Sequence, residues 1–350
     1  MNEHLRQDAA IHGGDGLEQR ASRTRALLYS RSEDGHRAAF IGFFSRLLGG
    51  ERVGVGRLVT SARPVLFLMI EEAFWLYVLL AVGRAMLGRR TAGFLFRPQQ
   101  ALSGQTLRLR TKRALLRLMR RIPRIVTLTI LPFAVEPRFA EIADGWIDDP
   151  QQWDLSEEDL KRFSQLKAGA PTLKTLIRAA AGKRSILCAI GRQDRDKGFD
   201  QFANSYIEQA TTRQSYLFAV GGRVSNDLKG QAEALVAAGG VVIDRRIDDA
   251  ELLELYAAAD IVWCCYSPGY DQSSGILGRA AQLGIPVLVR SGSLLQKLCE
   301  NEGIGHLVFG AGRLPVPEAT DTQLGWALRN RMRSRSVARL ITALGTSAAQ

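Results

Sequence analysis

Apolar and polar positions along this chain form blocks, in which short apolar runs of strand length alternate with stretches of helical periodicity. In the first half, residues 38–50 predict an amphipathic helix that ends at two glycines, and residues 105–121 predict a basic helix. The strand-like runs there are 26–30, 91–96 and 125–131. Strands that alternate with helices in this way predict a parallel sheet covered on both faces.

The second half repeats this pattern after a polar, helical stretch at 148–183, in which we place a domain boundary near residue 170. Its strand-like runs are 186–191, 215–221, 240–247, 260–267 and 286–291. The sequence therefore predicts an α/β protein with two Rossmann-like domains that face a cleft. The predicted parts are a disordered leader (1–22), a first domain (23–170), a second domain (171–320) and a basic C-terminal helix (321–350) that could pack back on the first domain.

Composition narrows the class of partner. The 350 residues are 46% hydrophobic, which excludes wholesale disorder, and the net charge of +12 favours nucleotides, nucleic acid or an acidic membrane surface. The four cysteines are not spaced as a metal-ligand set or a redox pair. We interpret them as free thiols of a protein in a reducing cytoplasm.

One stretch, residues 64–87, is long and apolar enough to resemble a membrane span. However, it contains Glu71, Glu72 and Arg84, and a charged side chain at the bilayer centre costs about 2.5–3.5 kcal/mol. We therefore expect a buried or half-buried helix, which could still lie against a membrane surface.

The loop at 268–275 lies between a predicted strand and a predicted helix. Ser273, Ser274 and Gly275 would present backbone N–H groups to an anion, and a serine there can cap the helix at the same time. Asp271 is the only carboxylate of this loop, and a solvated turn residue is its alternative interpretation.

A second loop, at 191–198, carries Arg192 and Lys197 five residues apart and then Gly198. A guanidinium and an ammonium at this spacing can converge on one pyrophosphate, although an ordinary solvated loop has the same composition. In the first domain, His36 follows the first strand and is a candidate acid/base or substrate contact, or an incidental loop histidine. Further candidates for the cleft are Gly35, Gly221, Gly222, Arg246, Tyr270 and Arg279.

The run 107–124 carries many Lys and Arg residues, apolar residues between them, and no acid. This composition is typical of a helix that rests on an anionic bilayer, with a solvated basic face and a nucleic-acid patch as alternatives. The arginines expected to share one helical face toward the membrane are Arg110, Arg113, Arg117, Arg120, Arg121 and Arg124.

Residues 184–312 resemble the C-terminal domain of GT-B glycosyltransferases of the large family 4 (group 1) type. The resemblance rests on the ordered elements GR-x4-KG at 191–198, DDAELLELYAAADIVW, YSPGYD, GILGRAAQLGIPVLV and ENEGIGHLV. It implies that Arg192 and Lys197 bind the diphosphate of a UDP-, GDP- or ADP-sugar. The family places glutamates where this chain has Asp271 and Arg279. Asp271 could keep the first role near the transferred sugar, whereas Arg279 cannot accept hydrogen bonds from ribose hydroxyls.

We therefore expect a hexosyltransferase that needs no metal and no cofactor, because Arg192 and Lys197 would stabilise the charge that develops on the leaving diphosphate. Its acceptor would be a lipid-linked saccharide or polysaccharide precursor at the cytoplasmic face of the cell membrane, where the protein would be peripheral, with Asp271 and His36 as the catalytic residues. The alternatives are a catalytically silent GT-B-like subunit that binds a partner protein or membrane, and a nucleotide-sugar epimerase. Nucleic-acid binding is not favoured, since it rests on charge alone.

Overall fold

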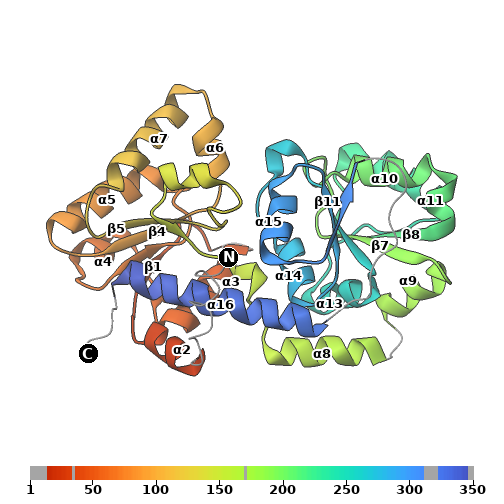
Figure 1. Ribbon diagram of the computed structural model, residues 1–350, viewed down its shortest axis with the longest axis horizontal. Coiled ribbons are helices and arrows are strands. Elements are labelled where there is room, and N and C mark those ends of the chain that lie inside the picture. The colour runs from red at the N-terminus through yellow and green to blue at the C-terminus, as the bar shows by residue number, and fades with distance from the viewer. Residues whose placement is uncertain (1–13, 34–35, 169–171, 311–321, 346–350) are drawn as a thin grey trace, which may run out of the picture. The chain divides into compact units, whose positions relative to one another are not determined.

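The computed structural model of the chain describes residues 14–33, 36–168, 172–310 and 322–345. The chain forms two compact units: unit 1 comprises Met1–Pro150 and Arg331–Gln350, and unit 2 comprises Gln151–Asn330. Each unit contains a six-stranded parallel sheet flanked by helices (Figure 1). The predicted α/β fold with two Rossmann-like units is therefore confirmed.

The sheet of unit 1 has the order β2-β1-β3-β4-β5-β6, and every neighbouring pair of strands is parallel. Its strands are β1 (Leu27–Tyr29), β2 (Glu51–Arg52), β3 (Val65–Phe67), β4 (Thr91–Leu95), β5 (Ile125–Thr129) and β6 (Gly145–Trp146). Its helices are α2 (Gly14–Ser22), α3 (His36–Leu48), α4 (Val55–Thr60), α5 (Phe74–Met86), α6 (Pro98–Ser103) and α7 (Leu107–Met119), with short 3-10 turns η2 (Pro137–Glu141) and η3 (Pro150–Gln152). The central strands β3 and β4 are buried along their whole length, which explains their continuous apolar sequence.

The apolar stretch 64–87 is not the single helix that we expected. Its first part is β3, which pairs with β1 and β4, and the helix α5 begins only at Phe74. Glu71 and Glu72 lie in the turn between strand and helix, where their carboxylates reach polar partners. Among the described helices, none has the length and apolar content needed to cross a bilayer.

The predicted leader, 1–22, is also helical where it is described, since α2 covers Gly14–Ser22. This helix packs against α3, Ala21 is fully buried, and Glu18 accepts a hydrogen bond from Arg333 at 2.5 Å. These contacts order a segment whose polar composition alone indicates disorder. Residues 1–13 lie outside the described part of the chain.

The sheet of unit 2 has the order β12-β11-β10-β7-β8-β9, again entirely parallel. Its strands are β7 (Ser185–Ile190), β8 (Tyr216–Gly221), β9 (Val241–Ile243), β10 (Ile261–Cys264), β11 (Val287–Arg290) and β12 (His306–Phe309). Its helices are α8 (Glu157–Ala168), α9 (Leu173–Ala181), α10 (Phe199–Ile207), α11 (Ala210–Ser215), α12 (Lys229–Ala237), α13 (Asp249–Ala258), α14 (Gly275–Gln282) and α15 (Leu294–Glu302), with 3-10 turns η4 (Asn226–Leu228) and η5 (Pro268–Tyr270).

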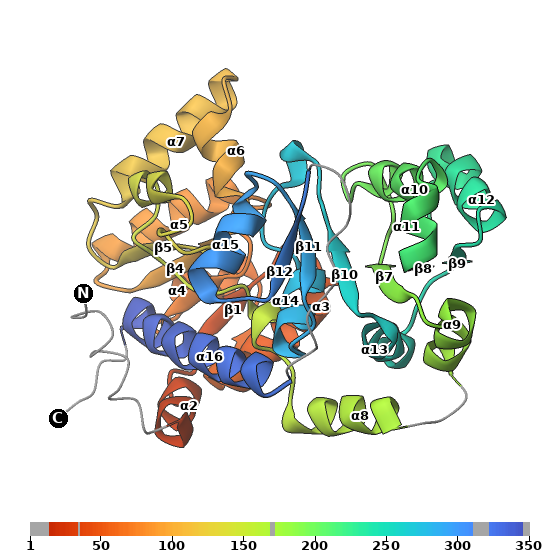
Figure 2. The ribbon, with the colours of Figure 1, turned by 45° about the vertical axis from the view of Figure 1, so that its right-hand side comes forward.

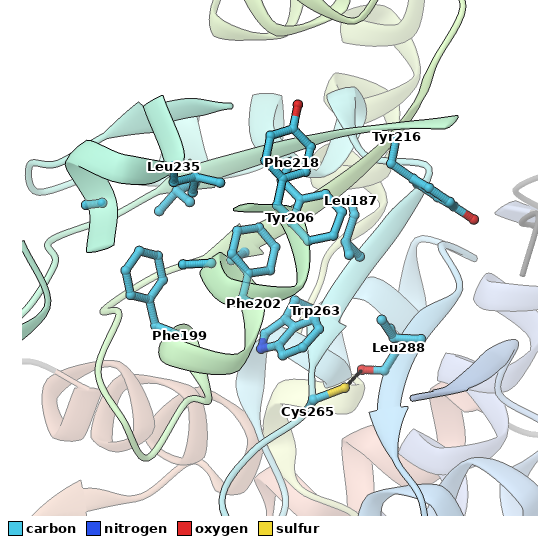
Figure 3. Packing of buried hydrophobic residues seen from close by; sticks show 14 of the residues in the cluster. Leu187, Phe199, Phe202, Tyr206, Tyr216, Phe218, Leu235, Trp263, Cys265 and Leu288 are labelled. Carbon is cyan, nitrogen blue, oxygen red and sulfur yellow. Dashed lines mark hydrogen bonds between the residues drawn. The ribbon is translucent and has the colours of Figure 1, made fainter. Parts of the chain in front are cut away.

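Aromatic side chains fill the core between this sheet and α10. The ring of Phe202 packs against Phe218 and Trp263, with centroids 4.6 and 5.3 Å apart (Figure 3). Aromatic pairs in offset or edge-to-face contact add stabilisation to the burial of their area. The Cys265 thiol, at the edge of this cluster, donates to the Leu288 carbonyl at 3.4 Å (Figure 3). This packing fixes the carboxyl end of β10, from which the candidate site extends.

The boundary between the units differs from the one predicted near residue 170, because the polar helical stretch belongs to unit 2. Both α8 and α9 pack against α13, and α9 and α13 lie side by side (Figure 2). Arg178 of α9 also forms a bidentate ion pair with Asp260, at 2.7 and 3.1 Å. Contacts between residues far apart in the sequence thus place the boundary after Pro150, near the start of the polar stretch rather than within it.

The C-terminal helix α16 (Thr322–Leu344) belongs to unit 1 from Arg331 onward. The buried carboxylate of Asp148 accepts hydrogen bonds from Arg335 Nε at 2.7 Å and Ser336 Oγ at 2.9 Å. The guanidinium of Arg339 lies 3.4 Å from the centroid of the Trp146 ring. The basic residues of this helix thus bind an acid and an aromatic ring of unit 1.

All four cysteines, Cys188, Cys264, Cys265 and Cys299, are buried free thiols of unit 2. Burial raises the pKa of Cys188 and of Cys264 to about 12 in each case, so neither is a thiolate at neutral pH.

Candidate functional site

The loop between β7 and α10 begins the candidate site at the carboxyl end of the unit 2 sheet. The backbone N–H of Lys197 donates to Asp194 Oδ1 at 2.9 Å, which closes the loop before α10. Gly198 has a φ of 70°, and a Cβ there would lie 2.2 Å from the carbonyl oxygen of Cys265. Glycine is therefore required, because it permits both the left-handed backbone and the close contact with the end of β10.

The side chain of Lys197 lies over aromatic rings. Its Nζ is 4.1 Å from the centroid of the Tyr266 ring and 5.0 Å from that of Tyr270, and the side chain is half-buried. Burial lowers the pKa of Lys197, and the positive charge of Arg192 lowers it further, against the opposing effect of nearby acids. Within the described ranges, no carboxylate oxygen lies within 4.0 Å of this ammonium. The site thus holds a half-buried cation that is available to an anion.

Arg192 occupies the same loop but has a different environment. Its side chain is 73% exposed, and Nη2 lies 2.5 Å from Asp194 Oδ2. The two cations are close enough to interact electrostatically. Their convergence on one pyrophosphate stays a prediction, since in this structure Arg192 is paired with Asp194.

The start of α14 is connected to Lys197 through Tyr266. The Tyr266 hydroxyl lies 2.7 Å from Ser274 Oγ, and Ser274 caps α14 by accepting from the N–H of Ile276 at 3.3 Å. A Cβ at Gly191 would lie 3.5 Å from Ile276 Cδ1, so the two loops are neighbours. The structure therefore brings the predicted Lys197 and Ser274 together at one edge of the sheet.

The start of α14 is covered rather than open, which corrects the expectation of an exposed cradle at Ser273–Gly275. Ser273 and Ser274 are buried, and Ser273 Oγ accepts from Gln152 Nε2 at 3.5 Å. A Cβ at Gly275 would lie 2.2 Å from Gln151 Oε1. The sequence interpretation did not include Gln151 and Gln152. In the sequence, only the glycines at 275 and 278 indicate this contact, because a residue without a side chain leaves room for the segment that holds Gln151 and Gln152.

Asp271 is engaged by its own unit. Its Oδ2 accepts from Arg290 Nη2 at 2.9 Å and from the N–H of Leu294 at 2.8 Å, at the start of α15. Burial raises the pKa of Asp271, although these hydrogen bonds favour the charged form. The carboxylate thus ties the loop to α15, and its role in catalysis stays a prediction.

Arg279 holds the segment that covers α14. Its Nη2 lies 3.5 Å from Asp154 Oδ2, and both side chains are largely buried. Gln282 reinforces the contact, because its Nε2 donates to Asp154 Oδ1 at 3.1 Å and to the Gln151 carbonyl at 2.8 Å. The arginine at the position of the family's second glutamate therefore has a structural partner in this chain.

The weaker cleft candidates have local explanations. A Cβ at Gly221 would lie 2.2 Å from Leu255 Cδ1, and one at Gly222 would lie 1.9 Å from the Gly191 carbonyl oxygen. Both glycines thus serve the packing of β8 and its loop, and Arg246 is an exposed residue after β9. Gly35 lies outside the described residues, and His36 is the first residue of α3.

The six arginines of 107–124 do not share one helical face, which corrects that expectation. The helix α7 ends at Met119, because Pro123 disfavours helical backbone before it and Arg124 has a φ of 73°. Three of the six contact unit 1 itself: Arg113 donates to the Leu102 carbonyl, Arg117 pairs with Glu141, and Arg120 pairs with Asp144. Five of the six are exposed, namely Arg110, Arg117, Arg120, Arg121 and Arg124.

Among the described residues, no group of three or more His, Cys, Asp or Glu side chains is placed to hold a metal ion. The independence from metal that we expected stays a prediction.

No protein-family model and no curated protein sequence matches the chain. Among solved structures, a UDP-forming α,α-trehalose-phosphate synthase from Burkholderia xenovorans is similar, with a TM-score of 0.53 and 11% identity, over 92% of this chain and 81% of that one. The catalytic domain of starch synthase IV from Arabidopsis thaliana, bound to ADP and acarbose, has a TM-score of 0.51 and 12% identity, over 90% of this chain and 79% of that one. Both are GT-B glycosyltransferases, and this chain has their GT-B fold, as the sequence predicted.

Proposed function

We propose that this protein is a glycosyltransferase that moves a hexose from a nucleotide-sugar to a saccharide acceptor. The observation that carries the proposal is the ammonium of Lys197, which is half-buried over two tyrosine rings beside the start of α14. A buried cation is stable when an anion satisfies it, and the diphosphate of a nucleotide-sugar is such an anion. The GT-B fold and the ADP bound to the similar starch synthase support this assignment.

The chemistry follows from where charge develops. Over the reaction, an acceptor hydroxyl oxygen replaces the phosphate oxygen on the anomeric carbon and gives its proton to a base. The electron pair of the broken bond moves to the phosphate oxygen. Lys197 and Arg192 then stabilise the leaving nucleoside diphosphate, which is the reason that we propose no metal. Asp271 near the sugar and His36 as acid/base are the catalytic residues of the proposal, and the donor is a UDP-, GDP- or ADP-sugar.

The test compares two cations of one loop. Lys197→Met removes the ammonium, and we expect a loss of about 10- to 100-fold in affinity for ADP, UDP or GDP, as for a charge-assisted hydrogen bond. The matched control is Arg195→Met, because Arg195 is exposed and paired with Asp227 at 3.0 Å. Titration calorimetry on the full chain measures both. The proposal fails if no nucleotide binds the wild-type protein, or if Lys197→Met binds as the wild type does.

We propose that the acceptor lies at the cytoplasmic face of the cell membrane, and the surface of α5 supports this proposal. Its exposed apolar side chains recur along one face of the helix: Trp75 is 54% exposed, Leu79 is 72% exposed and Met86 is 83% exposed. An apolar face of this kind is stabilised by contact with a lipid or protein surface.

The neighbouring helix α7 favours the lipid surface. It packs against α5, and it exposes Leu107 and Leu118 together with Arg108 and Arg110. Exposed apolar side chains next to cations suit the boundary between acyl chains and anionic headgroups. A lipid-linked saccharide, as a polysaccharide precursor, is the acceptor that such a peripheral protein would meet.

A catalytically silent subunit is the second candidate, and Arg279 favours it. This residue is paired with Asp154 and offers no carboxylate to a ribose. The two candidates differ in turnover: a silent subunit binds a partner protein or membrane but releases no nucleoside diphosphate from a nucleotide-sugar. An epimerase would instead interconvert two nucleotide-sugars without an acceptor.

A further inference from the structure

Two adjacent glutamates at the carboxyl end of the unit 1 sheet have different environments. They follow β3, where the N–H of Ile70 still pairs with the Phe94 carbonyl. Glu72 is satisfied, because its carboxylate accepts from Arg37 Nε at 2.9 Å and its carbonyl accepts from Arg31 at 3.0 Å. Its neighbour Glu71 is only half satisfied.

One oxygen of Glu71, Oε1, accepts from the backbone N–H of Arg97 at 2.6 Å. The other, Oε2, is shielded from solvent and has no hydrogen-bond partner among the described residues. Burial accordingly raises the pKa of Glu71. A buried polar atom without a partner is uncommon in folded proteins, and it destabilises the structure unless a ligand or water satisfies it.

A cation of α7 acts on this carboxylate through its charge. The ammonium of Lys112 is close enough for its charge to lower the pKa of Glu71, against the larger effect of burial. Its Nζ lies 5.1 Å from the centroid of the Phe74 ring, and the side chain is half-buried. Within the described ranges the two groups form no ion pair at 4.0 Å or less. The ammonium therefore lies within electrostatic range of the carboxylate but makes no ion pair with it.

We propose that Glu71 and Lys112 bind a hydroxyl group of the acceptor saccharide, an inference that rests on the proposed function. A hydroxyl suits this pair of groups because it can donate its hydrogen to Glu71 Oε2 while its oxygen accepts from Lys112 Nζ. A phosphate or carboxylate would instead meet the negative charge of Glu71. Because Oε2 is shielded from solvent, side chains around it must move to admit the hydroxyl.

The position in the fold agrees with this role. Glu71 follows β3, its partner Arg97 follows β4, and both strands end at the same edge of a parallel sheet. Open α/β sheets bind their ligands outside the carboxyl ends of their strands. Glu71 and Lys112 belong to unit 1, whereas Lys197 belongs to unit 2, so this hydroxyl site uses other residues than the diphosphate site.

The test uses two variants and a matched control on the full chain. Glu71→Gln and Lys112→Met each remove one charged half of the site, and Glu72→Gln removes the adjacent carboxylate, which is already paired with Arg37. The probes are D-glucose and octyl β-D-glucoside, with binding measured by saturation-transfer NMR and calorimetry. We expect both site variants to lose about 10- to 100-fold in affinity for a glucoside, as for hydrogen bonds to charged groups. Glu72→Gln should bind it as the wild type does.

The result also separates this inference from the proposed function, which nucleotide binding tests independently. All three variants should bind ADP, UDP or GDP as the wild-type protein does. If wild-type protein binds neither probe, or if both site variants retain full affinity, Glu71 and Lys112 bind no saccharide hydroxyl and the inference is wrong. If a glucoside binds through Glu71 but no nucleotide binds, the hydroxyl site stands and the proposed function fails.

Discussion

The ammonium of Lys197 lies 4.1 Å from the centroid of the Tyr266 ring. Such a cation–π contact lets a lysine remain charged in a half-buried place. It cannot replace the hydration that burial removes, so the pKa of Lys197 stays below the ordinary lysine value. Both the affinity for a nucleotide and the stability of the fold should therefore depend on pH through this residue.

Affinity for ADP should fall as the pH rises through the lowered pKa of Lys197, because only the ammonium attracts a phosphate. The loss should begin below the pH at which an ordinary lysine titrates. Lys197→Arg should keep its affinity constant, since a guanidinium stays protonated. Dissociation constants measured between about pH 7 and 10 check this. Equal pH profiles for the wild type and Lys197→Arg would contradict it.

Stability should change in the opposite direction. Between the lowered pKa and the ordinary value of 10.5, the unfolded chain binds more protons at Lys197 than the folded protein does. The free energy of unfolding should therefore rise with pH in that window when no ligand is present. Urea titrations of the wild type and Lys197→Met should diverge there, with the steeper rise in the wild type.

Arg279 and Asp154 should be coupled in stability. Arg279→Ala leaves a largely buried carboxylate without its guanidinium, and we expect it to lower the free energy of unfolding by about 1–3 kcal/mol. The double variant with Asp154→Ala should lose less than the sum of the two single variants. Arg279→Glu should be the most destabilising change, because it sets two carboxylates against each other. Additive effects in urea unfolding would show that the pair contributes nothing.

Gly278→Ala should loosen the segment that covers α14. The new Cβ would lie 2.5 Å from the Gln151 carbonyl oxygen, and we expect a destabilisation of about 1–3 kcal/mol. Gly230→Ala is the matched control, because it lies in α12 with no atom near its Cβ position. That substitution should stabilise the protein by about 0.4–1 kcal/mol. Thermal unfolding of both variants measures the difference.

Leu79→Ser should weaken attachment to anionic vesicles if α5 enters the lipid surface. Leu79 is 72% exposed, so the change should leave the fold intact while it removes apolar contact worth about 1.5–3 kcal/mol. Val236→Ser, at a half-exposed site on α12 of unit 2, is the control. Flotation with phosphatidylglycerol vesicles compares the two. Equal flotation of both variants and the wild type would exclude α5 from the contact.

The sequence predicts the long buried strands well, since β4, β5, β7 and β8 are continuous apolar runs. It did not predict β2 and β6, because two residues are too few to show a period. It also missed β12, whose side chains are half-buried at a sheet edge and give no continuous apolar run.

The same limit applies to the site. Lys197 and Ser274 could be predicted because each lies in a loop between an apolar strand and a helix. The partners that decide their environment come from far along the chain: Gln152 reaches Ser273, and Asp154 reaches Arg279. The end of α7 could be predicted from the local sequence, since Pro123 disfavours helical backbone before it. The prediction of a single helical face followed the basic composition of the run instead.

The buried thiols have a practical consequence. All four lie in unit 2 and none in unit 1. Burial keeps reagents away from the sulfur atoms and keeps the thiols protonated. A soluble alkylating reagent would therefore modify the native protein only while unit 2 opens. The rate of modification would report how often one half of the molecule unfolds, with no label added, and a nucleotide held by Lys197 should slow it.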